Sequence, residues 1–185
     1  MSILIYIIGC NNEERKTRYY FPQIGWALDV PEMFEVLDST EMETLNNEGK
    51  SSFEKSTGNT LDFSSTKNLI SIKKGELNYL RAGITPYPHD YKEWLESYAN
   101  VKSDLVRSFQ TITSELKIDS SSSIEVHDGI EFDKFDLKLT FSDNRIMNII
   151  LYSKLFKGYD FGVAIFYADE NILVRNLKIY FLEAV

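Results

Sequence analysis

Three consecutive apolar stretches between residues 130 and 168 restrict the fold of this chain more than any other feature. In the first stretch, polar residues alternate with four apolar ones: Phe135, Leu137, Leu139 and Phe141. Alternation with a period of two is typical of a strand that buries one face. Short polar connections at 142–145 and 157–158 lead to the second and third stretches, whereas parallel pairing would need a much longer crossover. The region therefore predicts an antiparallel meander.

Two amphipathic helices are predicted from apolar residues that recur every three or four positions. The longer one runs from about residue 90 to residue 116, and its apolar stripe consists of Trp94, Tyr98, Val101, Leu105, Phe109 and Ile112. The other begins at Thr40, where Glu43 completes a capping box, and ends at Gly58. The stripe of the longer helix is expected to pack across the sheet.

Further strands are predicted from alternating or apolar runs that end at turn residues. Residues 25–30 form one such run, which Pro31 ends. Residues 69–73 and 78–87 form a hairpin around Gly75, and residues 124–126 and 130–132 flank a tight turn at 127–129. The complete set of elements predicts an α+β fold, in which an antiparallel sheet of six to seven strands carries helices on its faces.

Three local predictions depend on single signals. Four consecutive serines place a surface loop at 118–123, because serine favours turns. The parity of the apolar positions changes between Phe132 and Phe135, which predicts a β-bulge near Asp133 and Lys134. After Asp169, a last helix is predicted, and a short strand at 177–181 is the alternative.

Length and charge limit the domain count and the partners. The chain has 185 residues, which favours one domain that buries about two thirds of its unfolded surface. Its 28 acidic and 20 basic residues give a formal charge of −8. Such a surface repels phosphate backbones, so no nucleic-acid partner is expected.

The N-terminal residues predict a lipid anchor. Residues 3–8 are apolar or aromatic, and the segment at 7–10, Ile-Ile-Gly-Cys, resembles the lipobox of bacterial lipoproteins. In that motif, a small residue precedes the cysteine that is acylated and becomes the new N-terminus. The resemblance implies a signal at 1–9, lipidation of Cys10, a polar tether at 10–18 and a folded domain at 19–185. The protein would then be held to the membrane of the cell envelope by Cys10, as an outer membrane lipoprotein.

A different structure for the same residues leads to a different location. Residues 3–8 are rich in β-branched side chains, which also suit a first strand that ends in a buried Cys10. The protein would then be a soluble cytoplasmic adaptor or an immunity-type protein. Residues 11–18 contain no apolar side chain and favour the tether.

The order of the predicted elements resembles that of the PsbP-like family. The segment at 25–31, Gly-Trp-Ala-Leu-Asp-Val-Pro, is similar to the aromatic and aliphatic strand, ending in proline, with which many members open. The resemblance implies an α/β/α sandwich. It also implies a domain that binds or assembles with another envelope protein and has no catalytic residues.

The residues that usually carry chemistry form no recognisable motif. His89 and His127 are each followed by an aspartate, but they are far apart in the sequence. No nucleophile elbow and no phosphate-binding glycine loop occur. We therefore predict a binding protein rather than an enzyme, without a cofactor or metal. Four residues form the candidate ligand surface: Tyr19, Tyr20, His127 and Asp128.

Overall fold

A computed structural model describes residues 15–58, 60, 64–111, 115–168 and 178–181 of the chain. The helices of this part are α1 (Ser39–Thr57) and α2 (Tyr91–Gln110). Its strands are β1 (Lys16–Phe21), β2 (Trp26–Pro31), β3 (Glu35–Val36), β4 (Lys67–Lys73), β5 (Tyr79–Pro86), β6 (Lys117–His127), β7 (Ile130–Thr140), β8 (Ile146–Phe156), β9 (Tyr159–Tyr167) and β10 (Lys178–Phe181).

The described strands form two antiparallel sheets. The large sheet has seven strands in the order β3-β4-β5-β9-β8-β7-β6, and the small sheet has the order β1-β2-β10. Strands β7, β8 and β9 pair in sequence, as the alternating pattern and short connections predicted. The predicted α+β class and the antiparallel sheet are therefore confirmed.

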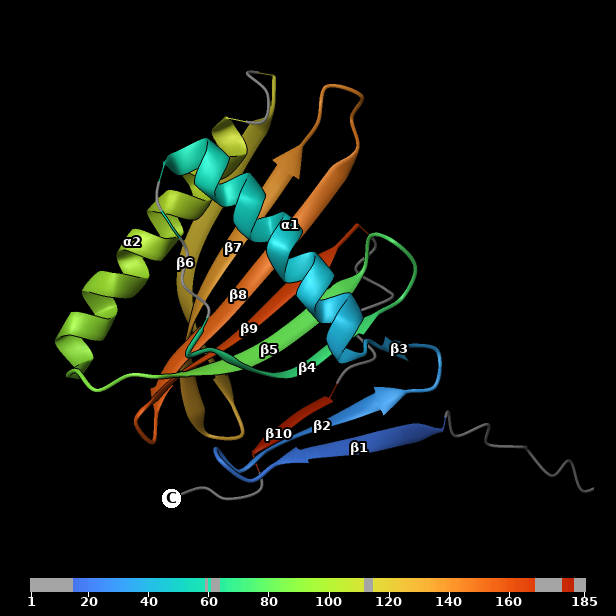
Figure 1. Cartoon of the computed structure of the whole chain (residues 1–185), viewed down its shortest axis with the longest axis vertical. Coiled ribbons are helices and arrows are strands. Elements are labelled where there is room, and N and C mark those ends of the chain that lie inside the picture. Colours follow the sequence, from blue (N-terminus) through green and yellow to red (C-terminus); the bar gives the residue numbers. More distant parts are fainter. Residues whose placement is uncertain (1–14, 59, 61–63, 112–114, 169–177, 182–185) are drawn as a thin grey trace, which may run out of the picture.

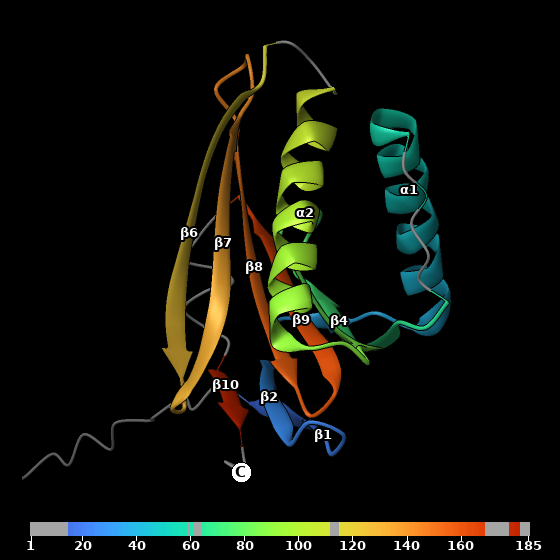
Figure 2. The ribbon, with the colours of Figure 1, turned by 90° about the vertical axis from the view of Figure 1, so that its left-hand side faces the viewer.

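Helices and small sheet cover opposite faces of the large sheet. In Figures 1 and 2, α1 and α2 lie together on one face. Trp26 and Leu28 of the small sheet pack instead with Phe132, Tyr152 and Phe161 on the other face. The large sheet is thus the middle layer of the fold, and it carries one core on each side.

Strand β7 contributes to both cores without a bulge. Its pairing with β6 and with β8 continues without a shift of register, so the bulge predicted near Asp133 and Lys134 is wrong. Phe132 packs in the core under the small sheet, whereas Phe135 packs in the core under α2. Successive strand residues point to opposite faces, so the apolar parity changes where the covering layer changes.

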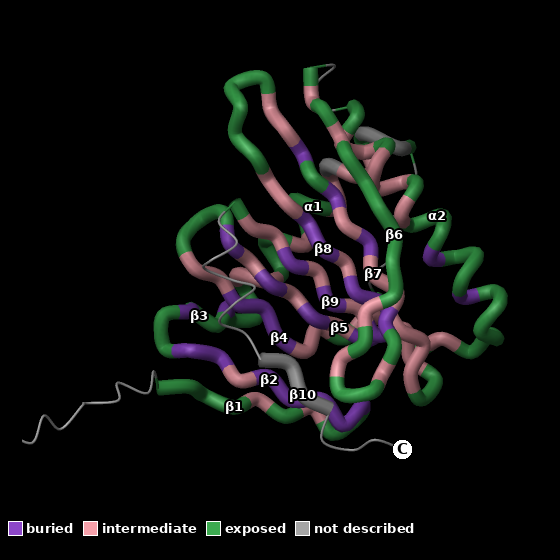
Figure 3. The backbone as a smooth tube through the Cα atoms, turned by 180° about the vertical axis from the view of Figure 1, so that it is seen from behind, coloured by how far each residue is buried: buried purple, intermediate pink, exposed green. Residues whose placement is uncertain are grey.

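The four serines lie in a strand rather than in a loop. Residues 120–123 belong to β6, which pairs with β7 along its whole length. Figure 3 shows β6 as a largely exposed strand. Serine is tolerated there because neither face of this stretch enters a core, and the pairing with β7 outweighs the turn preference of serine. The predicted surface loop at 118–123 is wrong.

The ends of both helices are fixed by side-chain caps. Asp38 accepts hydrogen bonds from the backbone N–H groups of Thr40 and Glu41, and the Glu41 carboxylate accepts one from the N–H of Asp38. The capping box therefore starts at Asp38 and not at Thr40. Gly58, with φ 73°, ends α1 as predicted, and Asp90 caps α2. Helix α2 ends at Gln110, before the predicted residue 116, and the chain enters β6 at Lys117.

The predicted domain boundaries shift at the start of the chain. Strand β1 begins at Lys16, so the fold includes residues that we assigned to the tether. The helix predicted after Asp169 extends to Phe181. Its residues 169–177 lie outside the described part of the chain, and the prediction is wrong for residues 178–181, which form a strand. The alternative, a short strand, is found as β10, which pairs with β2.

Candidate functional site

A groove of about 350 Å³ runs alongside α2, over the helix-facing side of β5, β9 and β8. Figure 1 shows α1 and α2 close together at their upper ends and diverging across this face of the sheet. The residues that line the groove are Thr66, Arg81, Gly83, Thr85, Trp94, Ser97, Tyr98, Val101, Leu151, Tyr152, Ser153, Asp160, Gly162, Val163 and Ala164. We call this hollow the α2 groove.

Two glycines that face each other form the floor of the α2 groove. Gly83 of β5 pairs with Gly162 of β9. A Cβ atom at Gly83 would lie 3.2 Å from the carbonyl oxygen of Lys67, so a side chain at this position would press on β4. A Cβ atom at Gly162 would meet no atom closer than 3.9 Å. The missing side chain at Gly162 therefore leaves open space rather than avoiding a clash.

One wall of the groove is a row of stacked aromatic rings on α2. The ring centroids of Trp94 and Tyr98 are 5.5 Å apart with an interplanar angle of 5°, and Tyr91 stacks on Trp94 from the other side at 5.5 Å. Residues three and four apart lie on one face of a helix, which aligns the three rings. Lys102 lies over the Tyr98 ring and donates to Ser122 of β6. The wall is thus held firmly in place.

Asp160 is the acidic group of the groove. Its Oδ1 accepts a hydrogen bond of 2.9 Å from the Trp94 indole N–H. Burial raises the pKa of the Asp160 carboxyl, although the hydrogen bonds from Trp94 and Ser153 act in the opposite direction. None of the ion pairs among the described residues includes Asp160. The carboxyl group is therefore desolvated without a compensating cation.

The hydroxyl group of Tyr98, which lines the same groove as Asp160, is buried. Tyr98 is 7% exposed, and its hydroxyl has no hydrogen-bond partner within the described part of the chain. Burial raises the pKa of Tyr98, and the negative charges of Asp133 and Asp160 raise it further. Most buried polar groups in proteins are paired, so an unpaired hydroxyl that lines a groove marks a place where a ligand can bind.

Arg81 supplies the basic group of the groove. Its Nε donates to the Asn68 side-chain oxygen at 3.2 Å, and its Nη1 donates to the side-chain oxygen of Asn46 in α1. Arg81 pairs with Ala164, whereas Asp160 pairs with Thr85, so the two charged residues lie at different ends of the glycine floor. The groove therefore has a basic group at one end and an acidic group at the other.

We expect Asp160→Asn to stabilise the protein at neutral pH and to leave it unchanged at acidic pH. The pKa of Asp160 in the folded protein is raised above the ordinary 3.8, so its favourable contribution is present below 3.8 and is lost as pH rises through the folded pKa. Asparagine keeps an acceptor for Trp94 and carries no charge. Thermal melts from pH 3 to pH 8 measure the difference; each kcal/mol corresponds to about 2–4 °C for a chain of this size.

Asp143→Asn is the control for this titration. Hydrogen bonds from Arg145 lower the pKa of Asp143, so its contribution is present at neutral pH and is lost as pH falls. At pH 7, the melting temperature of Asp160→Asn should therefore be higher than that of the wild type, and the melting temperature of Asp143→Asn should be lower. A melting temperature of Asp160→Asn that follows the wild type at every pH would contradict the assigned desolvation of Asp160.

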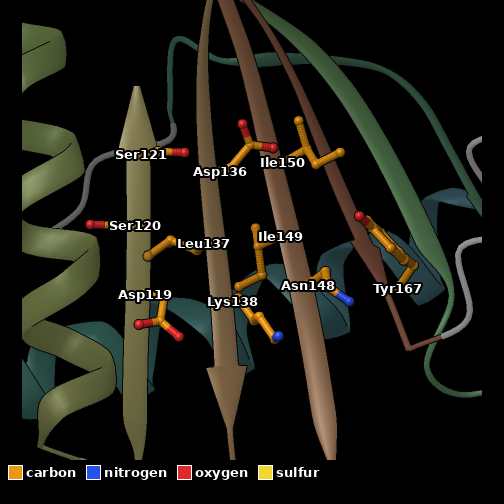
Figure 4. A pocket seen from close by; sticks show the side chains of 10 residues that line it. All are labelled: Asp119, Ser120, Ser121, Asp136, Leu137, Lys138, Asn148, Ile149, Ile150 and Tyr167. Carbon is orange, nitrogen blue, oxygen red and sulfur yellow. The ribbon is translucent and has the colours of Figure 1, made fainter. Parts of the chain in front are cut away.

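A second, smaller hollow lies on the opposite face of the large sheet. Its volume is about 240 Å³, and its lining residues are Asp119, Ser120, Ser121, Asp136, Leu137, Lys138, Asn148, Ile149, Ile150 and Tyr167. Figure 4 shows these side chains spread over β6, β7, β8 and β9. Asp119 pairs with Lys138 across the strands, so opposite charges lie side by side there. This outer hollow lacks a buried hydroxyl of the kind found at Tyr98.

The four residues of the predicted ligand surface lie on two separate elements. Tyr19 and Tyr20 are in β1, where Tyr19 packs against the core and Tyr20 is 44% exposed. His127 ends β6, and Asp128, with φ 48°, begins the turn to β7. None of the four lines the α2 groove or the outer hollow. Their role as a ligand surface stays a prediction.

The histidines are placed beside glutamates outside the groove. His89 Nδ1 lies 2.9 Å from Glu93 in the first turn of α2, and His127 Nε2 lies 3.1 Å from Glu125. Burial raises the pKa of Glu125, but the Lys134 ammonium 3.0 Å away outweighs it and holds the pKa below its ordinary value. Each contact places a histidine beside a carboxylate, and neither histidine lines the α2 groove.

Sequence reasoning missed the groove residues, although one signal was available. Glycine inside a strand often marks a site where another group approaches closely, and Gly83 and Gly162 are such positions. The charges at Arg81 and Asp160 gave no signal, because each is a single polar residue in an alternating strand. Their relation depends on the pairing of β5 with β9, which the sequence pattern does not determine.

The described residues contain no group of three or more histidine, cysteine, aspartate or glutamate side chains placed to hold a metal ion. Nor does any helix among them have the length and apolar character needed to cross a membrane.

The fold has a counterpart among solved structures. The solution structure of cyanobacterial PsbP (CyanoP) from Synechocystis sp. PCC 6803 matches 93% of this chain and 96% of its own length, with a TM-score of 0.55 and 11% sequence identity. No family model and no curated protein sequence matches the chain. The structural match confirms the predicted PsbP-like fold.

Proposed function

We propose that this chain is a non-catalytic binding domain of the cell envelope and that its ligand occupies the α2 groove. One observation carries the proposal: the Tyr98 hydroxyl lies buried and unpaired in a groove whose floor is kept open at Gly162. A bound group that pairs with this hydroxyl would remove the cost of an unsatisfied polar atom, which is about 1–3 kcal/mol. The rigid strands and the stacked rings hold the groove open for it.

The chemistry of the lining supports binding rather than catalysis. Both acidic groups, Asp160 and Tyr98, have raised pKa values, so the environment favours their neutral forms. The raised pKa of Tyr98 keeps its hydroxyl protonated near neutral pH, so this group acts as a hydrogen-bonding partner rather than as a nucleophile. The lining contains neither histidine nor cysteine. The groove is thus suited to hold a ligand by hydrogen bonds and apolar contact.

The proposed location depends on Cys10. Acylation of this residue would attach the domain to a membrane, and two or more acyl chains on one residue are sufficient for stable anchoring. Cys10 is the single cysteine of the chain, and polar residues separate it from β1. The anchor and the groove would then be independent of each other.

We expect Cys10→Ser to move the protein from the membrane fraction to the soluble fraction without a loss of folding. The native gene with its upstream region is expressed in a Gram-negative host, and both forms are fractionated and labelled with palmitate. A labelled wild type and an unlabelled, folded mutant support the anchor. A wild type that stays in the cytoplasm, or a mutant that unfolds, would instead favour the soluble adaptor in which residues 3–8 form a first strand.

The groove is tested by filling it. Gly162→Val adds a side chain to the floor without a close contact at Cβ, so we expect a folded protein with a blocked groove. The probe is the apolar anionic dye 1-anilinonaphthalene-8-sulfonate, and dye fluorescence measures its affinity. We expect at least tenfold weaker dye binding. Ser121→Val, which reduces the polarity of the outer hollow, is the control and should leave the affinity unchanged.

A further inference from the structure

The α2 groove carries opposite charges at two positions that are separated along one strand. Arg81 and Thr85 belong to β5, and Thr85 is the partner of Asp160. At 3.2–3.4 Å per strand residue, the Cα atoms of Arg81 and Thr85 are about 13 Å apart. The glycine floor formed by Gly83 and Gly162 lies between them. A ligand that lies along the floor therefore meets a guanidinium at one end and a carboxyl group at the other.

The Asp160 end is suited to an ammonium group. The carboxyl is desolvated, and none of the ion pairs among the described residues supplies it with a cation. The hydroxyl of Tyr98 has a free lone pair and lies where the charge of Asp160 influences it. An ammonium group has three N–H donors and no acceptor. An ammonium group beside Asp160 would favour the ionised form of its carboxyl group, and it can donate to that carboxylate and to the hydroxyl together.

The Arg81 end is suited to a carboxylate. Asn68 and Asn46 orient the guanidinium through its Nε and Nη1 atoms. A guanidinium whose position is fixed loses little conformational freedom when it binds an anion, and its planar geometry matches a carboxylate. The hydroxyls of Thr66 and Thr85 share a hydrogen bond of 3.0 Å, and Thr85, the partner of Asp160, lies at the other end of the floor. Arg81 is therefore the cationic side chain that a ligand meets in the groove.

We infer that the α2 groove binds a short, extended peptide with free ends, and this inference rests on the proposed function. The peptide ammonium contacts Asp160 and Tyr98, and its carboxylate contacts Arg81. An extended chain spans about 3.3–3.6 Å per residue, so three to four residues bridge the two positions. Apolar side chains of the peptide face Val101 and Leu151, which also line the groove. The floor at Gly162 leaves room for the peptide main chain.

The test compares peptides whose ends are free or blocked. Calorimetry measures the affinity of the wild type for trialanine and tetra-alanine, for their N-acetylated forms and for their C-terminal amides. We expect each blocked form to bind at least tenfold more weakly than the free peptide. Equal affinities of free and blocked peptides would overturn the inference, because charge at the peptide ends would then have no role.

Three conservative variants assign each end of the peptide to its contact. In Asp160→Asn, the free and N-acetylated peptides should bind equally, while the C-terminal amide should still bind more weakly than the free peptide. Arg81→Gln should give the reverse pattern. Tyr98→Phe removes the hydroxyl alone and should weaken the binding of peptides with a free amine. Asp136→Asn in the outer hollow is the matched control and should change no affinity.

The dye experiment separates failure of this inference from failure of the proposed function. If Gly162→Val blocks the dye but no peptide binds to the wild type, the groove is a binding site and the peptide assignment is wrong. If neither the dye nor any peptide responds to Gly162→Val, both are wrong. Thermal melts of each variant show whether it is folded, so that a loss of affinity is not caused by unfolding.

Discussion

Replacing Trp26 by alanine is expected to lower the free energy of unfolding by about 3–5 kcal/mol. Trp26 is fully buried between the two sheets, where its ring lies 5.0 Å from that of Phe21 and 5.2 Å from that of Phe161. Removal of the ring leaves a cavity that rigid strands on both sides cannot close. Urea denaturation followed by far-ultraviolet circular dichroism measures the effect.

Two further variants make this expectation specific. Tyr20→Ala changes an aromatic residue of the neighbouring strand that is 44% exposed, so its cost should be much smaller. Trp26→Phe keeps most of the ring and removes an indole N–H that has no partner among the described residues. Removal of an unpaired buried donor is favourable, so it offsets part of the free energy that is lost with the packing contacts. A cost of Trp26→Ala similar to that of Tyr20→Ala would mean that the small sheet does not cover the large one.

The parts of the fold with strong periodicity were predicted from the sequence. Alternation located β7, and spacings of three and four residues located α2. These patterns arise because one side of each element is buried while the other is exposed. The turn at 127–129 was also predicted. In the structure, Asp128 and Gly129 adopt the positive φ angles of 48° and 79° that tight hairpins require.

Predictions failed where a local signal competed with tertiary pairing. The serines at 120–123 favour turns in isolation, but the unbroken pairing of β6 with β7 holds them in a strand. The apolar positions change from even to odd numbers after Phe132. This change indicates a bulge only if a single face of the strand is buried along its whole length. In this fold, the small sheet covers one face and α2 covers the other. A sequence pattern cannot reveal which layer covers which stretch.

The candidate site was not predicted because it depends on contacts between distant residues. Asp160 and Trp94 are 66 residues apart in the sequence, and their hydrogen bond joins the first turn of α2 to the start of β9. The lipobox resemblance at Cys10 is different, because a motif of four adjacent residues needs no tertiary structure. Sequence analysis therefore led to a proposed location, whereas the proposed ligand site required the structure.

Leu139→Ala is expected to cost about 2–5 kcal/mol for a reason independent of Trp26. Leu139 is 1% exposed and packs in the core under α2, with Leu105 and Phe109 among its neighbours. Trp26 belongs to the core on the opposite face, and the two clusters share no buried residue. Changes at sites without shared partners add to within about 0.5 kcal/mol.

The double variant Trp26→Ala and Leu139→Ala therefore tests the three-layer architecture itself. If the large sheet separates two independent cores, the two costs should add, and their sum of roughly 5–10 kcal/mol approaches the whole stability of a typical domain. Milder replacements, Trp26→Phe with Leu139→Val, keep the double variant folded enough for denaturation curves. A double-mutant cycle with a coupling energy above about 1 kcal/mol would show that the cores are continuous. The sheet would then transmit packing changes between the small sheet and the α2 groove, because α2 lies on the core that contains Leu139.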